Sequence, residues 1–89
     1  MITIYKYPLD IIDMQKIYMP RGAKILTVQM QGKQLCLWAE VDTKNQLDAR
    51  RIAIVGTGSP APEFLVGYSQ YISTVQERTF VWHVYEVVI

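Results

Sequence analysis

The sequence predicts an all-β domain: a compact small β-sandwich or a partly open barrel of about six to seven mostly antiparallel strands, with at most one short helical turn. Three observations predict it. Segments rich in β-branched and aromatic residues recur along the chain, residues that favour turns separate them, and no segment has the pattern of a helix of useful size. With 89 residues, 51% of them hydrophobic, the chain is expected to form a single domain, residues 1–89.

The first strand is expected over residues 2–7, where isoleucines and tyrosines alternate between the two faces. Pro8 is expected to end it. The second strand is expected over residues 12–18, and its mixed polarity indicates an edge position. A turn signal at residues 20–22 ends that strand.

The stretch over residues 23–41 predicts a β-hairpin with its turn at Gly32 and Lys33. Glycine then occupies the first central position of a type II′ turn, which needs a positive φ. A slip of one residue would mix the apolar and polar faces, so pattern and turn support one register. The expected pairs are Gln31–Gln34, Met30–Leu35, Val28–Leu37 and Leu26–Ala39, alternating with Gln29–Cys36, Thr27–Trp38 and Ile25–Glu40.

The polar residues 42–48 predict an exposed loop, and residues 49–55 predict the next strand. Residues 56–62 are rich in glycine and proline and are expected to form a loop, in which Ser59 caps a short helical turn that includes Phe64 and Leu65.

Two further strands are expected over residues 68–75 and 79–88, joined by a polar turn at residues 76–78. The last strand is apolar on both faces, which is typical of a central or sandwiched strand. We expect it to pair with the strand before it.

Composition limits the classes of function. The formal net charge of +1 argues against non-specific nucleic-acid binding, and no direct nucleic-acid partner is expected. No signal peptide is visible and no apolar run approaches the ~20 residues that span a bilayer, so we expect a soluble intracellular protein that does not bind membranes. Charged residues are only 19%, beside six tyrosines and two tryptophans, which indicates that a partner or a second copy covers part of the surface.

Few residues point to catalysis. His83, the only histidine, lies in an apolar strand, where a hydrogen-bonded structural role is expected. Cys36, the only cysteine, is expected to act as a small buried hydrophobe. One of each cannot supply three or four metal ligands, and the eight carboxylates form no convincing acid–base pair. We therefore predict no catalytic residue, metal or cofactor, and no enzyme.

One group of residues could bind a ligand. The turn Gly56, Thr57, Gly58 and Ser59 follows a strand, and such turns can offer backbone N–H groups to an anion. It lacks the lysine of a P-loop and the third glycine of a dinucleotide fingerprint, so a plain connecting loop is the favoured interpretation. Arg50 and Arg51 on the preceding strand support the alternative, a nucleotide-binding site.

The aromatic residues favour a protein interface, because tryptophan, tyrosine and arginine anchor such interfaces. The candidates are Arg21, Trp38 and Tyr71. In the predicted hairpin, Trp38 and Ile25 share a face with polar residues. Either a second sheet covers this face, which we favour, or another protein does.

Four segments together resemble a family of small proteins of tailed bacteriophages and prophages: I-Y-K-Y-P (residues 4–8), M-P-R-G-A (19–23), C-L-W-A (36–39) and V-W-H-V (81–84). The resemblance covers nearly the whole chain. It implies a phage accessory protein made in the cytoplasm of a host bacterium, where such proteins are often host-takeover or counter-defence factors, anti-CRISPRs included. The family has no established catalytic residues to carry over.

Three hypotheses follow. In the first, the protein binds a host bacterial protein and inhibits or redirects it by covering a functional site. In the second, it sequesters a nucleotide signal with Arg50, Arg51 and the turn over residues 56–59. In the third, it is a minor virion or assembly component whose sheet edges pair in a homo-oligomer.

Overall fold

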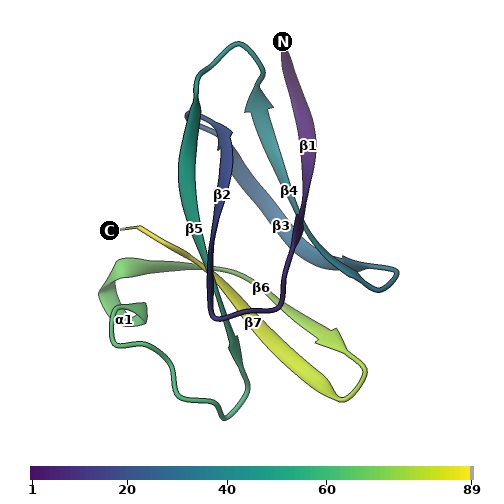
Figure 1. Cartoon of the computed structure of the whole chain (residues 1–89), viewed down its shortest axis with the longest axis vertical. Helices are drawn as coiled ribbons and strands as arrows, with labels where there is room; N and C mark the ends of the chain where they lie inside the picture. The colour runs from purple at the N-terminus through teal and green to yellow at the C-terminus, as the bar shows by residue number, and fades with distance from the viewer. Residues whose placement is uncertain (89) are drawn as a thin grey trace.

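The computed structural model describes residues 1–88 and contains two antiparallel sheets (Figure 1). One sheet has three strands in the order β1-β4-β3, and the other has four in the order β2-β5-β7-β6. The predicted fold class is confirmed, because both sheets are open and a single short helix accompanies them. The elements are β1 (Ile2–Leu9), β2 (Met14–Pro20), β3 (Lys24–Gln31), β4 (Gln34–Asp42), β5 (Leu47–Gly56), α1 (Leu65–Tyr68), β6 (Ser69–Glu77) and β7 (Phe80–Val87).

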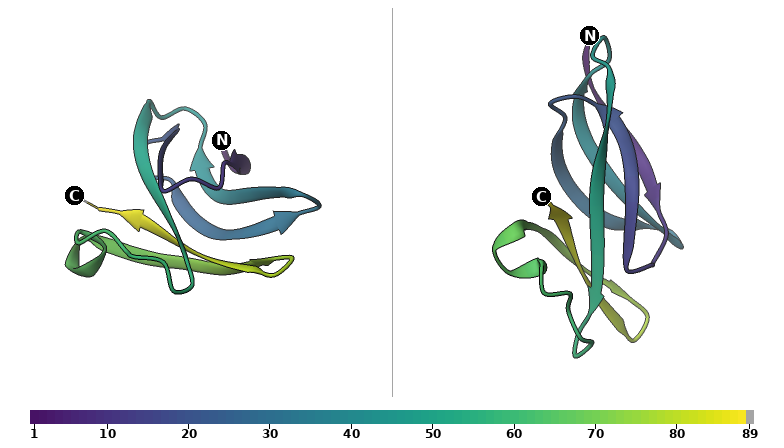
Figure 2. Two further views of the ribbon diagram at one scale, coloured as in Figure 1. Left: turned by 60° about the horizontal axis from the view of Figure 1, so that its bottom comes forward. Right: turned by 60° about the vertical axis from the view of Figure 1, so that its left-hand side comes forward.

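The hydrophobic core lies between the sheets. Leu35 and Leu37 of β4 pack in one buried cluster with Ile52 of β5 and Val84 of β7. Figure 2 shows the β3–β4 and β6–β7 hairpins in separate layers, with β5 extending past both. At one side β3 approaches β6, and the hydroxyl of Ser73 accepts a 3.0 Å hydrogen bond from the backbone N–H of Val28.

The central hairpin has the predicted turn. Gly32 has a φ of +60°, and the register from Gln31–Gln34 to Thr27–Trp38 is as expected. Beyond that point the register shifts, so that Ile25 lies opposite Ala39 and Lys24 opposite Glu40. The predicted pairs Leu26–Ala39 and Ile25–Glu40 are therefore wrong. Leu26 is the extra residue of a β-bulge, and it lies beside the segment where β3 approaches β6.

Pro8 does not end the first strand, which continues to Leu9. The backbone N–H of Thr43 donates to the carbonyl of Met1, which places the odd-numbered residues of β1 in hydrogen-bonded pairs with β4. Pro8 is even-numbered, so its missing N–H falls on the open side, where proline is tolerated. β2 begins two residues later than predicted, and its edge position is confirmed.

The other boundaries also moved. The predicted loop over residues 42–48 shortens to 43–46, since β5 already begins at Leu47. Ser59 does not cap a helix: its backbone N–H donates to the carbonyl of Gly56, and α1 begins after Phe64 without a side-chain cap. The β6–β7 turn lies at Arg78 and Thr79, so it begins two residues later than expected and ends one residue later.

The last strand, β7, lies between β5 and β6, as its two apolar faces predicted. Within residues 1–88, no helix is long and apolar enough to cross a membrane.

Candidate functional site

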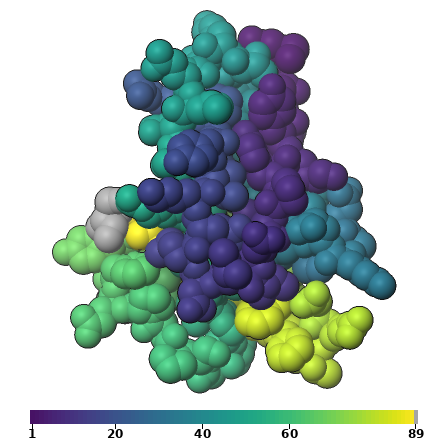
Figure 3. Space-filling model, viewed as in Figure 1, coloured from purple at the N-terminus to yellow at the C-terminus, as the bar shows by residue number. Residues whose placement is uncertain are grey.

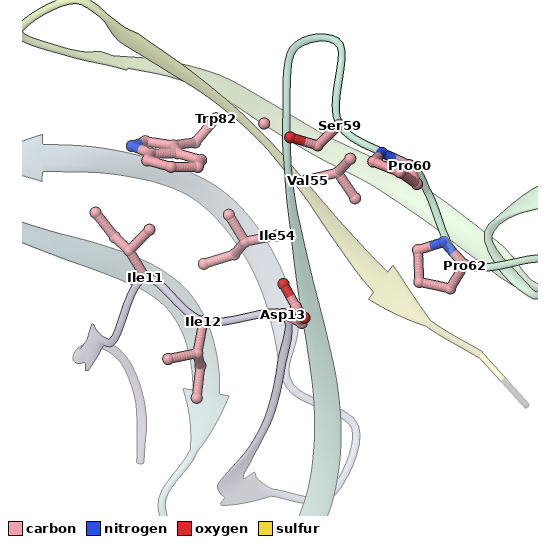
Figure 4. Close-up of a pocket in the computed structure, with 10 residues that line it drawn as sticks. Ile11, Ile12, Asp13, Ile54, Val55, Ser59, Pro60, Pro62 and Trp82 are labelled. Atoms are coloured by element: carbon pink, nitrogen blue, oxygen red, sulfur yellow. The ribbon is translucent and has the colours of Figure 1, made fainter.

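A hollow of about 250 Å³ opens at one end of the sandwich, where three segments distant in sequence meet (Figure 4). We call it the Trp82 hollow. The loop between β1 and β2 forms one wall, the loop after β5 forms the opposite wall, and β5 and β7 complete it. Its lining residues are Ile11, Ile12, Asp13, Ile54, Val55, Gly56, Ser59, Pro60, Pro62 and Trp82.

Three hydrogen bonds position the wall made by the β1–β2 loop. The side-chain amide of Gln15 donates to the carbonyl of Asp10 at 2.7 Å, and its oxygen accepts the N–H of the same residue at 3.1 Å. The carbonyl of Asp13 accepts the N–H of Ile54 on β5 at 3.1 Å. Ile11 packs against the core, whereas Ile12 remains 49% exposed at the rim.

Gly56, on the neighbouring strand, makes room for the indole ring of Trp82. The two residues pair across β5 and β7, and a Cβ at Gly56 would lie 3.1 Å from Cζ3 of the indole. The glycine therefore lets the ring lie close against the neighbouring strand. The exposed ring of Phe80 stacks on the indole with centroids 5.5 Å apart. Within residues 1–88, the buried Nε1 of Trp82 has no hydrogen-bond partner, and Figure 4 shows it on the side away from Ser59.

Few of the side chains that line the hollow are polar. The carboxylate of Asp13 and the hydroxyl of Ser59 lie among isoleucines and prolines, on opposite sides (Figure 4). Pockets for small molecules usually measure ~300–1,000 Å³, so this one suits a single inserted side chain better than a cofactor. A partner that inserts an apolar side chain and carries a hydrogen-bond donor next to it would match the apolar walls of the hollow and the carboxylate of Asp13.

A family model described as a domain of unknown function (DUF7352) matches residues 1–88. The chain belongs to this family. No curated protein and no solved structure gives a significant match. The resemblance to phage proteins stays a prediction, because the DUF7352 match carries no function.

Arg50, a predicted ligand residue, is engaged within the fold. Its guanidinium binds both carboxylate oxygens of Glu86 on β7, and its Nη1 donates to the carbonyl of Ala23 at 2.8 Å. The hydrogen bonding of its guanidinium to the Glu86 carboxylate raises the pKa of Arg50 above its ordinary value, and partial burial opposes this shift. Arg50 therefore braces β5, β7 and the start of β3.

The other predicted ligand residues do not join it. Arg51 follows Arg50 on a strand, so its side chain leaves from the opposite face, where it is exposed. Gly56 lies five residues further along β5, roughly 16 Å away at the usual strand rise. In the turn, the N–H of Thr57 donates to the carbonyl of Val81 and that of Ser59 to Gly56, and Gly58 has a φ of +82°. The structure thus does not assemble the predicted nucleotide site.

The three predicted interface residues lie on different surfaces. Arg21 is in the turn after β2, with its Nε 3.8 Å from a carboxylate oxygen of Asp48. Trp38 is half-buried on the outer face of the three-stranded sheet, which the second sheet does not cover. Tyr71 is exposed on β6 and packs edge-on against Tyr85.

His83 is hydrogen-bonded, as expected. Its Nε2 lies 2.7 Å from the hydroxyl of Thr57, and its Nδ1 lies 3.1 Å from that of Thr74. Cys36 is buried, also as expected. No group of three or more His, Cys, Asp or Glu residues within the described part of the chain is placed to hold a metal ion.

The candidate ligand residues Gly56 and Ser59 line the Trp82 hollow, but the hollow itself was not predicted from the sequence. The sequence pattern places Ile12, Phe80 and Trp82 in strands, and it includes Trp82 among the aromatic residues that could anchor an interface, but it does not bring them together. The available signal was Gly56 opposite an aromatic residue, but recognising it required the pairing of β5 with β7, which no local pattern predicts.

Proposed function

We propose that the protein is a non-enzymatic phage accessory protein that binds a host bacterial protein in the bacterial cytoplasm and inhibits or redirects it. A counter-defence factor of the anti-CRISPR type is the specific form that the resemblance favours. The observation that supports a binding role is the Trp82 hollow, a recess lined mostly by apolar side chains, with the exposed Ile12 at its rim. Exposed apolar surface around a pocket is typical of protein interfaces.

The proposed mechanism is steric. A side chain of the target enters the hollow, and Ile12 at the rim and Phe80, which stacks on Trp82, cover the contact from water. Burial of one leucine-sized side chain supplies ~1.5–3 kcal/mol, whereas micromolar affinity needs about 8 kcal/mol. The rim must therefore contribute most of the binding energy, and the bound protein would block whatever function the covered surface serves.

The nucleotide alternative gains no support from the geometry, because Arg50 is paired with Glu86 and lies far from the turn over residues 56–59. The assembly alternative depends on the sheet edges, which are a separate feature from the hollow.

Two matched variants test the binding role. Ile12→Lys places a charge at the rim of the hollow, and Leu47→Lys places one on a similarly exposed residue (64%) at the other end of β5. Pull-downs from lysates of bacterial hosts should recover a protein with the wild type and Leu47→Lys but not with Ile12→Lys, and circular dichroism should show both variants folded. Recovery that is equal for all three, or absent across plausible hosts, would contradict the proposal.

A further inference from the structure

The outer edge of β1 is open. Within residues 1–88, β1 pairs with β4 and with no other strand. Figure 1 shows it at the margin of its sheet, and in Figure 3 its purple atoms form part of the margin of the molecule. An unpaired strand edge is a template on which another strand can add.

The backbone of β1 directs three residues toward this open edge. The pairing of Met1 with Thr43 assigns the odd-numbered residues to β4, so Ile2, Ile4 and Lys6 turn both N–H and C=O outward. Pro8 turns outward as well, and its lack of an N–H ends the continuous run of donors. The available edge is therefore short and centred on Ile4.

The side chains along this edge favour association. Ile2 and Ile4 are 64% and 57% exposed, and Lys6 carries the only charge within the strand. Natural edges are usually protected by charges or prolines, and none precedes Lys6 here. β2, the open edge of the other sheet, is different, because its outward positions are centred on Lys16 and self-pairing would bring two lysines together.

We propose that β1 pairs antiparallel with β1 of a second copy of this chain, around a two-fold axis at Ile4. Ile4 then lies opposite Ile4 of the second copy, Ile2 opposite Lys6, and Thr3 opposite Tyr5. This register satisfies the outward donors and acceptors of all three residues, leaves Pro8 outside the paired segment and keeps the two lysines apart. The two three-stranded sheets become one continuous sheet of six strands.

This inference goes beyond the proposed function and does not depend on it. The Trp82 hollow lies beyond the far end of β1, at the loop to β2, so pairing around Ile4 leaves it open. A strand of another protein is the other conceivable occupant, and the experiment separates the two.

The first measurement is the mass in solution by sedimentation over a range of concentrations. The wild type should reach twice the chain mass of 10.3 kDa. Ile4→Lys should raise the dissociation constant of the dimer at least about tenfold, because like charges meet at the axis. Tyr18→Lys, an exposed residue on the edge strand β2, should leave it unchanged. A wild type that stays monomeric at millimolar concentration would overturn the proposal and leave the edge to a strand of another protein.

Cysteine cross-linking tests the register. Residues in a hydrogen-bonded antiparallel pair have Cα atoms ~5.5 Å apart, within disulfide range. Ile4→Cys should therefore form a covalent dimer under mild oxidation, whereas Lys6→Cys, which lies opposite Ile2, should not. The buried native Cys36 is not expected to compete. Equal cross-linking of the two variants would refute the register, and thermal melting checks that each variant is folded.

Discussion

Replacing Arg50 with methionine should destabilise the fold by about 2–3 kcal/mol. The guanidinium holds the carboxylate of Glu86 through two hydrogen bonds and the carbonyl of Ala23 through a third. Only 22% of the Arg50 side chain and 12% of the Glu86 side chain are exposed. Removing one member of a fully buried pair costs ~3–5 kcal/mol, and partial exposure reduces that value here.

The assay is urea unfolding followed by circular dichroism, with Arg51→Met as the matched control. Arg51 is the next residue on the strand and faces the other way, and loss of an exposed charge there should cost less than ~1 kcal/mol. The double variant Arg50→Met, Glu86→Leu should be more stable than Arg50→Met alone, because no unpaired carboxylate remains buried. Equal effects of the two arginine substitutions, or strict additivity in the double variant, would refute the bracing role.

Three further outcomes are expected. Gly32→Ala should cost about 1–2 kcal/mol in thermal or urea unfolding, because φ is +60° and nothing else crowds the site; a neutral result would contradict the predicted turn. Gly56→Ala should cost ~1–3 kcal/mol and change the near-ultraviolet circular dichroism of Trp82, which would have to move. The backbone hydrogen bond from Lys44 lowers the pKa of Asp42, so its charge stabilises the fold above the unfolded pKa, and this contribution is lost as the pH falls through the folded value. Asp42→Asn should thus be less stable than the wild type at neutral pH, with the difference beginning to shrink below about pH 3.9 and vanishing once the pH is below the folded pKa; a difference independent of pH would contradict this.

Local chemistry was enough to predict the strands and the central hairpin, since Gly32 and the apolar alternation specify one turn and one register. It failed at Leu26, where a β-bulge shifts the register beside the segment of β3 that contacts β6, a strand far away in sequence. It also failed at Pro8, because whether a proline ends a strand depends on which side of that strand is paired.

The candidate ligand site shows a different kind of failure. Arg50 and Arg51 were grouped because they are adjacent, yet adjacent residues on a strand point to opposite faces. The alternation that predicted the strand could have separated them. The Trp82 hollow, by contrast, is built from the β1–β2 loop, β5 and β7, and only the tertiary pairing of these segments brings them together.

The pair of hydrogen bonds between Gln15 and the backbone of Asp10 has a thermodynamic consequence for any ligand of the hollow. Because the backbone of that wall is already ordered, association should avoid much of the conformational entropy loss that a mobile loop would add. The calorimetric signature would be a negative heat-capacity change from apolar burial, without the large unfavourable entropy of coupled folding. Gln15→Ala would release the wall, and the affinity lost would then appear as a more unfavourable binding entropy.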